Sequence, residues 1–168
     1  MAEQTAVSHD ITKLVDKIKD IRIAMMTTAE PDGSLHARPM YTQKPEENGT
    51  LWFFTEQDSK KVHEVKKDRH INLAYANPDD NLYVAITGTA NVVTDRAKIK
   101  ELWSEGLRGW FPKGQDDPNI ALLQVTIETG EFWDSPNSTL LRAYAYAKAV
   151  LTGEPHKPGP DEHAIVKP

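Results

Sequence analysis

The sequence predicts a mainly β fold of the α+β class, an antiparallel barrel with helices at its ends and edges. Short apolar strands are separated by tight turns, a pattern that favours such a barrel over a parallel α/β sheet. Gly88 interrupts the longest expected strand, 82–94, where a glycine marks a bulge, a close backbone approach or, as we expect here, a barrel corner. A chain of 168 residues fits one core, which we place at 1–153, followed by an extended, proline-rich tail at 154–168.

The composition is that of a folded globular protein, with 39% hydrophobic and 27% charged residues. The net charge of -5 argues against nucleic-acid and membrane-surface partners, because both require a basic surface. The absence of cysteine excludes disulfides and thiolate chemistry and fits a reducing compartment. Met1–Asp10 is polar and unlike a secretory signal, and no stretch approaches the roughly 20 apolar residues of a membrane span. We therefore expect a cytoplasmic protein.

The sequence pattern of residues 8–55 predicts one helix and three strands. Ser8 can cap a helix whose apolar residues recur at i, i+3, i+4 and i+7 and share one face: Ile11, Leu14, Val15 and Ile18. The β-branched and Met-rich segment 21–28 predicts a strand, and Pro31-Asp32-Gly33-Ser34 predicts a tight turn that returns the chain over 35–43. A further turn leads into a strand over 50–55.

The sequence pattern after residue 55 predicts three more helices and four strands. A short, mostly solvated helix is expected between Asp58 and Lys67, and Asp95 can cap a helix with Ile99, Leu102 and Trp103 on one face. The last helix, 138–151, should end at Gly153, because glycine favours the left-handed residue that terminates helices. Strands are expected over 70–76, 82–94, 120–127 and 131–133.

Ser59-Lys60-Lys61 stands at the predicted start of a helix, directly after the strand that contains Thr55. Lysines are unfavourable there, because the helix dipole already places about half a positive charge at this end. A charge run is often a solvated surface. Backbone N–H groups, hydroxyls and two ammonium groups together nevertheless form an anion site, and we expect an anion opposite them.

Arg38-Pro39-Met40 lies in the second arm of the predicted hairpin. An arginine on a strand is most often part of a rim salt bridge, and the proline suggests an edge strand. A proline also leaves neighbouring backbone groups without a ladder partner, so they can face a heteroaromatic ring. The functional interpretation depends on the convergence of Arg38 and Lys61.

These motifs occur in an order that resembles the pyridoxamine 5'-phosphate oxidase-like superfamily of split barrels. The order is Gly33, Arg38-Pro39-Met40, Phe53-Phe54-Thr55, Ser59-Lys60-Lys61 and Gly88. The bacterial general stress protein branch is the most similar, through Trp110-Phe111-Pro112, Asp117-Pro118 and Glu131-Phe132-Trp133. The resemblance covers about 11–151 and implies an antiparallel Greek-key split β-barrel that binds FMN.

The resemblance also implies a set of cofactor-binding residues and a homodimer with the flavin at the subunit interface. Trp133, and with it Trp110, would approach the flavin ring from the partner chain. The other residues implied to bind the flavin are Arg38, Pro39, Met40, Tyr41, Thr42, Gln43, Phe54, Thr55, Ser59, Lys60 and Lys61.

The chain departs from the vitamin oxidases of this superfamily at three places. Those enzymes follow the Phe-Trp strand with an Arg-Leu-His segment that holds the substrate, whereas this chain continues with Asp134-Ser135-Pro136-Asn137-Ser138. Gln43 stands where they usually carry lysine, and Tyr83 where they carry glutamine. We therefore do not expect pyridoxamine phosphate oxidase activity.

Other chemistries have weaker support in the sequence. The six histidines include no pair at i, i+4 on one helix face, so we expect no metal site, and His36 is the one that lies beside the predicted flavin strand. The carboxylate pairs Asp79-Asp80 and Asp116-Asp117 adjoin turn residues and are expected to be solvated. No nucleophile elbow supports a serine hydrolase.

Two functions follow from the resemblance. The first is a flavin-dependent oxidoreductase that acts on an unassigned small molecule, with no catalytic residue named. The second is a stress protein that stores, buffers or senses flavin without turnover. FMN is the expected cofactor, and FAD, haem or a deazaflavin remain alternatives within the superfamily.

Overall fold

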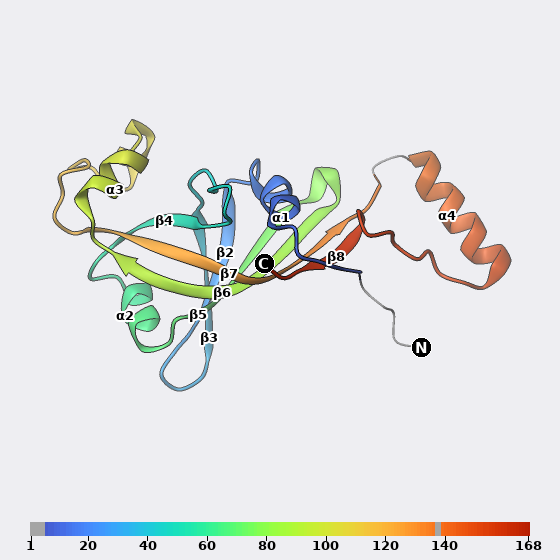
Figure 1. Cartoon of the computed structure of the whole chain (residues 1–168), viewed down its shortest axis with the longest axis horizontal. Coiled ribbons are helices and arrows are strands. Elements are labelled where there is room, and N and C mark those ends of the chain that lie inside the picture. Colours follow the sequence, from blue (N-terminus) through green and yellow to red (C-terminus); the bar gives the residue numbers. More distant parts are fainter. Residues whose placement is uncertain (1–5, 137–138) are drawn as a thin grey trace.

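The computed structural model describes residues 6–136 and 139–168, which form one curved, mainly antiparallel sheet with helices around it (Figure 1). The predicted mainly β, split-barrel fold is confirmed. The strands are β1 (Ala6–Ser8), β2 (Ile23–Ala29), β3 (Leu35–Tyr41), β4 (Leu51–Glu56), β5 (His70–Asn77), β6 (Leu82–Val93), β7 (Ile120–Asp134) and β8 (His163–Val166). The helices are α1 (Ile11–Ile18), α2 (Lys60–Lys67), α3 (Arg96–Leu102) and α4 (Thr139–Thr152), with 3-10 turns η1 (Pro78–Asp80) and η2 (Glu105–Gly109).

The sheet curls without closing completely. Its strand order is β1-β8-β7-β6-β5-β2-β3, and β4 pairs with β7. In the described part of the chain, one isolated bridge joins this edge of the sheet to β4, between Phe53 and Thr42, the residue that follows β3. Because few backbone bonds hold these two strands together, side chains can enclose a space along this seam.

Two apolar clusters lie on opposite faces of β4. The larger cluster fills the barrel and includes Phe53, while the smaller one joins Phe54 to residues of α3 and η2. Every residue of β4 except Glu56 is buried, as expected for a strand covered on both faces. Trp52 is buried and Trp103 packs against the smaller cluster, so both side chains serve packing.

A β-bulge interrupts the pairing of β6 with β7 at Gly88. The register shifts between Thr87 and Gly88, and a Cβ atom added at Gly88 would lie 2.2 Å from the Thr126 carbonyl oxygen. Only glycine therefore allows the two backbones to approach this closely. A bulge bends its strand and increases the local twist, and both long strands curve in Figure 1.

The structure corrects several predictions near the chain ends. Asp10, not Ser8, caps α1 by accepting a hydrogen bond from the Thr12 N–H, and Ser8 belongs to β1. The two predicted closing strands form one 15-residue strand, β7. Gly153 follows α4 with a φ of 71°, as expected, whereas Ser138, the predicted start of this helix, lies outside the described residues.

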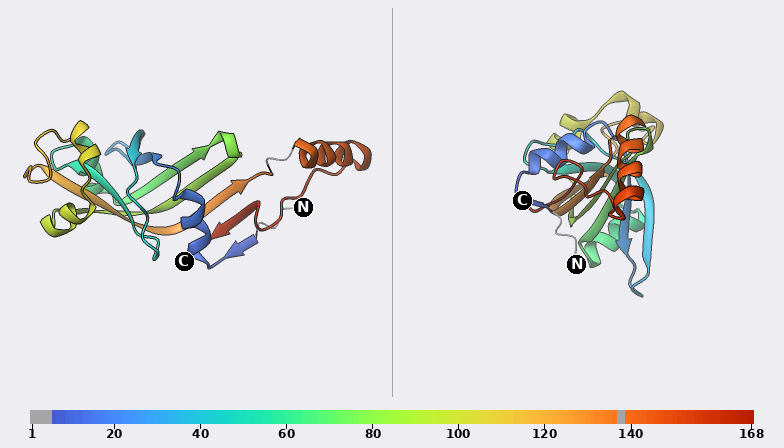
Figure 2. Two further views of the ribbon diagram at one scale, coloured as in Figure 1. Left: turned by 90° about the horizontal axis from the view of Figure 1, so that it is seen from above. Right: turned by 90° about the vertical axis from the view of Figure 1, so that its right-hand side faces the viewer.

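The C-terminal segment contains a strand that the sequence did not predict. Within 154–168, β8 pairs antiparallel with β7 and parallel with β1, and Ala164 and Val166 are buried in the main core. Helix α4, by contrast, has no buried residue and lies apart from the barrel in Figure 1 and in the left view of Figure 2. Among the described residues, no helix has the length and apolar character needed to cross a membrane.

Replacement of Gly88 by alanine should lower the free energy of unfolding by about 3 kcal/mol, because the added methyl group meets backbone that cannot rotate away. Denaturant unfolding followed by circular dichroism measures the change. Gly159→Ala is the matched control, since no atom lies within 4 Å of the Cβ position there. Equal stability of the two variants would contradict the account of the bulge.

Candidate functional site

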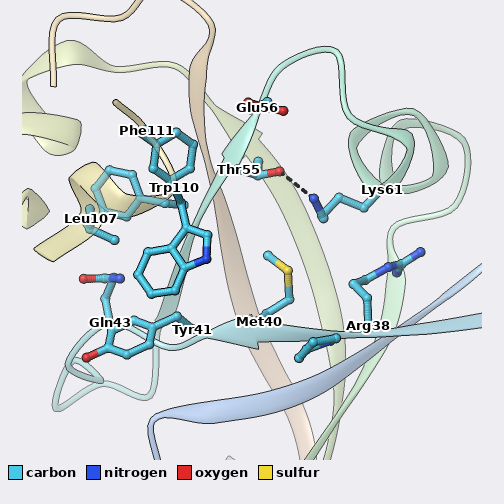
Figure 3. Close-up of a pocket in the computed structure, with 12 residues that line it drawn as sticks. Arg38, Met40, Tyr41, Gln43, Thr55, Glu56, Lys61, Leu107, Trp110 and Phe111 are labelled. Atoms are coloured by element: carbon cyan, nitrogen blue, oxygen red, sulfur yellow. Dashed lines mark hydrogen bonds between the residues drawn. The ribbon is translucent and has the colours of Figure 1, made fainter. Parts of the chain in front are cut away.

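A pocket of about 310 Å³ lies along the seam between β3 and β4 (Figure 3). The start of α2 borders one end, and η2 with the loop after it borders the other. This volume is near the lower end of the range of about 300–1,000 Å³ for small-molecule sites. The lining residues are Arg38, Pro39, Met40, Tyr41, Gln43, Phe54, Thr55, Glu56, Lys61, Leu107, Trp110 and Phe111.

Lys61 provides a cation at one end of the pocket. Its side chain extends from the first turn of α2 toward β4 (Figure 3), where Nζ donates a hydrogen bond to Thr55 Oγ1 at 3.2 Å. Ser59 Oγ lies 3.1 Å from the same hydroxyl oxygen. No carboxylate of the described residues lies within 4 Å of Lys61 Nζ. Burial, followed by the charge of Arg38, lowers the pKa of Lys61 below its usual value.

Arg38 also lines the pocket, but its guanidinium is engaged elsewhere. Nη2 lies 2.7 Å from Oε2 of Glu64 on α2, and Nη1 donates to Thr28 Oγ1 at 2.5 Å. In Figure 3 the guanidinium is directed away from the Lys61 ammonium. The predicted convergence of Arg38 and Lys61 is therefore limited: both border one end of the pocket, yet only Lys61 has its charge uncompensated by a close carboxylate.

Gln43 provides hydrogen-bonding capacity at the opposite end. The residue is buried, and its Nε2 atom has no hydrogen-bond partner among the described residues. The rings of Tyr41 and Trp110 lie at this end (Figure 3), with centroids 6.1 Å apart. A buried amide donor left unpaired is unfavourable by about 1–3 kcal/mol, so a ligand acceptor at this position would stabilise the site.

The walls between the two ends are apolar. Met40 comes from β3 and Phe54 from β4, while Leu107 and Phe111 come from the 3-10 turn η2 and the residues after it. Leu107 and Phe111 pack in the smaller core cluster, which holds this side of the pocket in place. The pocket thus combines a cation at one end, an amide donor at the other and an apolar slot between them.

Four of the predicted residues do not line this pocket. Thr42 is buried, with Oγ1 3.0 Å from the Tyr75 hydroxyl. Ser59 contacts the pocket residue Thr55 through its hydroxyl. The remaining two are Lys60, whose Nζ donates to Glu30 at 2.6 Å, and Trp133, which stacks on His163 in the same chain.

The sequence reasoning missed three lining residues and one supporting residue. Phe111 stands in the aromatic loop that the resemblance singled out, so its position offered a signal. Glu56 and Leu107 offered none, because a strand end and an isolated leucine are common everywhere. Glu64 lies in the lysine-rich α2, where the sequence suggests a solvated carboxylate, although its side chain is 3% exposed.

One group of side chains has the composition of a metal site. Ligand atoms of Glu30, His36 and Glu64 lie within 4.8 Å of one another. Cations of the protein already occupy this cluster, because Lys60 donates to Glu30 and Arg38 pairs with Glu64. A divalent ion would meet both positive charges, so the geometry gives no support to a metal centre here.

Comparisons with known proteins agree with this architecture. Residues 9–157 match the family model described as Pyridoxamine 5'-phosphate oxidase like. The chain is 29% identical to the protein bli-3 of Neurospora crassa over 162 residues, 90% of this chain and 78% of that protein. General stress protein 26 of Bacillus subtilis is 28% identical over 120 residues, 69% of this chain and 82% of that protein.

A solved structure extends the likeness to three dimensions. The crystal structure of the general stress FMN/FAD binding protein from Xanthomonas citri matches with a TM-score of 0.67 and 27% identity, covering 78% of this chain and 93% of the other. The family model spans most of the sequence, including both ends of the pocket. This chain therefore belongs to the pyridoxamine 5'-phosphate oxidase-like family, with relatives among the general stress proteins 26.

Proposed function

We propose that the pocket between β3 and β4 binds FMN and that the protein is a flavin-dependent oxidoreductase acting on a small molecule in the cytoplasm. The observation that carries this proposal is Lys61, a half-buried ammonium directed into the pocket without a carboxylate partner among the described residues. A phosphate would supply the missing negative charge, with Thr55 as an additional donor. The FMN/FAD-binding relative adds support from outside the chain.

The residues of the pocket fit a flavin mononucleotide. Gln43 offers its unpaired amide N–H to a ring acceptor, and Met40 and Phe54 offer apolar surface that excludes water. The volume of about 310 Å³ favours a mononucleotide over FAD. No lining residue is a histidine or cysteine, so the pocket offers haem neither of these common axial ligands. Bound flavin would supply the redox chemistry, while the protein binds and orients it.

We also propose that the protein is a homodimer in which a second copy covers the pocket. The outer face of the sheet carries an apolar row that is exposed at Pro39, Met25 and Ala74 and half-buried at Ala85, and these residues pair in register across β3, β2, β5 and β6. In a second row on the same face, Tyr41 pairs with Ile23, and Tyr83 pairs with Trp133.

A solvated antiparallel sheet face normally carries polar side chains, and exposed apolar patches mark interaction surfaces. The two rows reach from Tyr41 at the pocket to Trp133 at the far side of the sheet. A second copy packed on this face would bring its own Trp133 toward the first copy's pocket, in line with the family resemblance.

A second candidate function is flavin binding without turnover. The pocket residues include no histidine, and their one carboxylate belongs to the exposed Glu56. This scarcity of groups suited to proton transfer favours storage or sensing. Anaerobic reduction of the flavin-loaded protein by NADH or NADPH, followed by reoxidation with oxygen or a dye, separates the two functions, since a storage protein would not cycle.

Lys61→Ala should weaken FMN binding by about 1.5–3 kcal/mol, the contribution of a hydrogen bond to a charged group. Lys60→Ala is the matched control, because the Lys60 side chain is 60% exposed and its ammonium pairs with Glu30 outside the pocket. Fluorescence titration with FMN and with riboflavin measures both variants. A similar loss in both, or none in either, would contradict the placement of the phosphate.

The affinity for FMN should fall as the pH rises, at values below the usual lysine pKa of 10.5. The pKa of Lys61 is lowered, so its ammonium loses the proton, and with it the charge that attracts phosphate, earlier than an exposed lysine would. Lys61→Arg should abolish this decline, because arginine stays protonated. Riboflavin lacks the phosphate and serves as the control for titration of the flavin ring itself; the same decline for riboflavin would argue against Lys61.

Met25→Glu should convert the dimer to monomers, because it places a charge within the apolar rows of the outer sheet face. Light scattering coupled to size-exclusion chromatography measures the mass. Leu35→Glu is the control, since Leu35 is also exposed but lies at the tip of the same hairpin, outside both rows. A wild-type monomer, or a Met25→Glu dimer, would refute this interface.

A further inference from the structure

Glu64 is a buried carboxylate at the back of the phosphate end of the pocket. It lies on α2 with a side chain 3% exposed. Its Oε2 atom accepts hydrogen bonds from Thr28 Oγ1 at 2.5 Å and from Arg38 Nη2 at 2.7 Å. Oε1 has no hydrogen-bond partner among the described residues, and Lys60 Nζ and His36 Nδ1 lie 3.7 Å and 3.8 Å from it.

The same contacts determine what Arg38 can offer a ligand. Nη1 donates to Thr28, and Nη2 lies close to both Glu64 and His36, at 2.7 and 3.0 Å. The guanidinium side chain is 14% exposed. Both terminal nitrogens are therefore committed to the protein, and the charge of Arg38 is compensated by a neighbour that is shielded from water.

We propose that Glu64 is a specificity-determining residue that limits the positive charge at the phosphate end of the pocket. As the buried counter-ion of Arg38, it leaves Lys61 as the cation that distinguishes a phosphorylated flavin from an unphosphorylated one. A buried charge is poorly screened by salt, so Glu64 also repels an anion bound beyond Arg38. The inference rests on the proposed FMN site and deepens it, because it assigns the balance of charge there to one residue.

The contacts of the Glu64 side chain favour the ionised form that the inference requires. Burial alone would raise the pKa of Glu64, but the hydrogen bond from Thr28 and the charge and hydrogen bonding of Arg38 outweigh it and lower the pKa. Glu64 is then ionised across the pH range in which FMN binding is measured. A structural role alone would need only the hydrogen bonds, which a neutral side chain of the same shape can also accept.

The test is Glu64→Gln, which keeps the size of the side chain and removes its charge. Fluorescence titration gives the Kd for FMN and for riboflavin, and the ratio of riboflavin Kd to FMN Kd reports the contribution of the phosphate. We expect this ratio to rise about tenfold, with riboflavin affinity nearly constant, since a unit charge is removed from a poorly screened position. An unchanged or smaller ratio would overturn the inference.

Two matched variants show whether the charge of Glu64, its shape or its position determines the ratio. Glu64→Asp keeps the charge and should keep a ratio near that of the wild type. Glu30→Gln changes the net charge equally but acts on the carboxylate paired with the exposed Lys60, and it should change the ratio much less than Glu64→Gln. An Asp variant that behaves like the Gln variant would show that shape, not charge, sets the ratio.

The pH dependence of FMN affinity, which follows the titration of Lys61, provides a second measurement. A purely structural role of Glu64 would leave this pH dependence unchanged. The charged groups that act on Lys61 are Arg38 on β3, Glu56 on β4 and Glu64 on α2, and the two carboxylates raise its pKa. Removal of the Glu64 charge should therefore shift the alkaline decline of FMN affinity to lower pH. A decline at the wild-type pH would count against Glu64.

The double variant Arg38→Met with Glu64→Gln keeps the test decisive if Glu64→Gln fails to fold. Removal of a buried ion pair as a unit leaves no uncompensated charge, whereas Arg38→Met alone leaves Glu64 unpaired. The ratio of riboflavin Kd to FMN Kd should be higher for the double variant than for the single Arg38→Met variant. An equal or lower ratio in the double variant would refute the inference. A wild type that binds both ligands equally would instead refute the phosphate site itself.

Discussion

The pairing of β4 with β7 is the constraint on which the pocket depends. β4 is covered on both faces and held along its length by β7, so its last residues have little freedom. The chain leaves this ladder at Glu56 and enters α2 within a few residues. Thr55 and Lys61 are therefore fixed relative to each other by rigid elements, and β3, which is joined to β4 by one described bridge at the residue after it, can separate from β4 enough to enclose a ligand.

The electrostatics of the site follow from the order of residues in α2. Lys60, Lys61 and Glu64 lie within one turn of each other, yet the helix directs them to different surroundings. Lys60 reaches Glu30 at the surface, Lys61 faces the pocket, and Glu64 is buried against β2 and β3. Although the sequence of this segment suggests a run of surface charge, its three side chains therefore have different roles: a surface ion pair, a cation in the pocket and a buried ion pair.

Much of this architecture is accessible from the sequence, because it rests on local patterns. Alternation and turn residues predict strands β2 to β7, and the glycine within the longest strand indicates an irregularity at Gly88, which we expected to be a barrel corner and which the structure shows as a bulge. Ser8 is wrong as the predicted helix cap because it pairs with β8 as part of β1, and Asp10, which is also a good cap, takes this position. β8 was missed because a four-residue strand among prolines has no periodic signal. Glu64 was missed because burial of a charge depends on Arg38, which is distant in sequence.

The exposure of α4 bears on how the chain end is held. An isolated helix of this length is marginal in water without packing, and α4 separates β8 from the body of the sheet along the chain. A protease that cut within α4 would leave 163–166 attached through its ladders with β7 and β1 and through Ala164 and Val166 in the core. The nicked molecule would then behave as a two-piece assembly, with its terminal peptide inserted between β1 and β7.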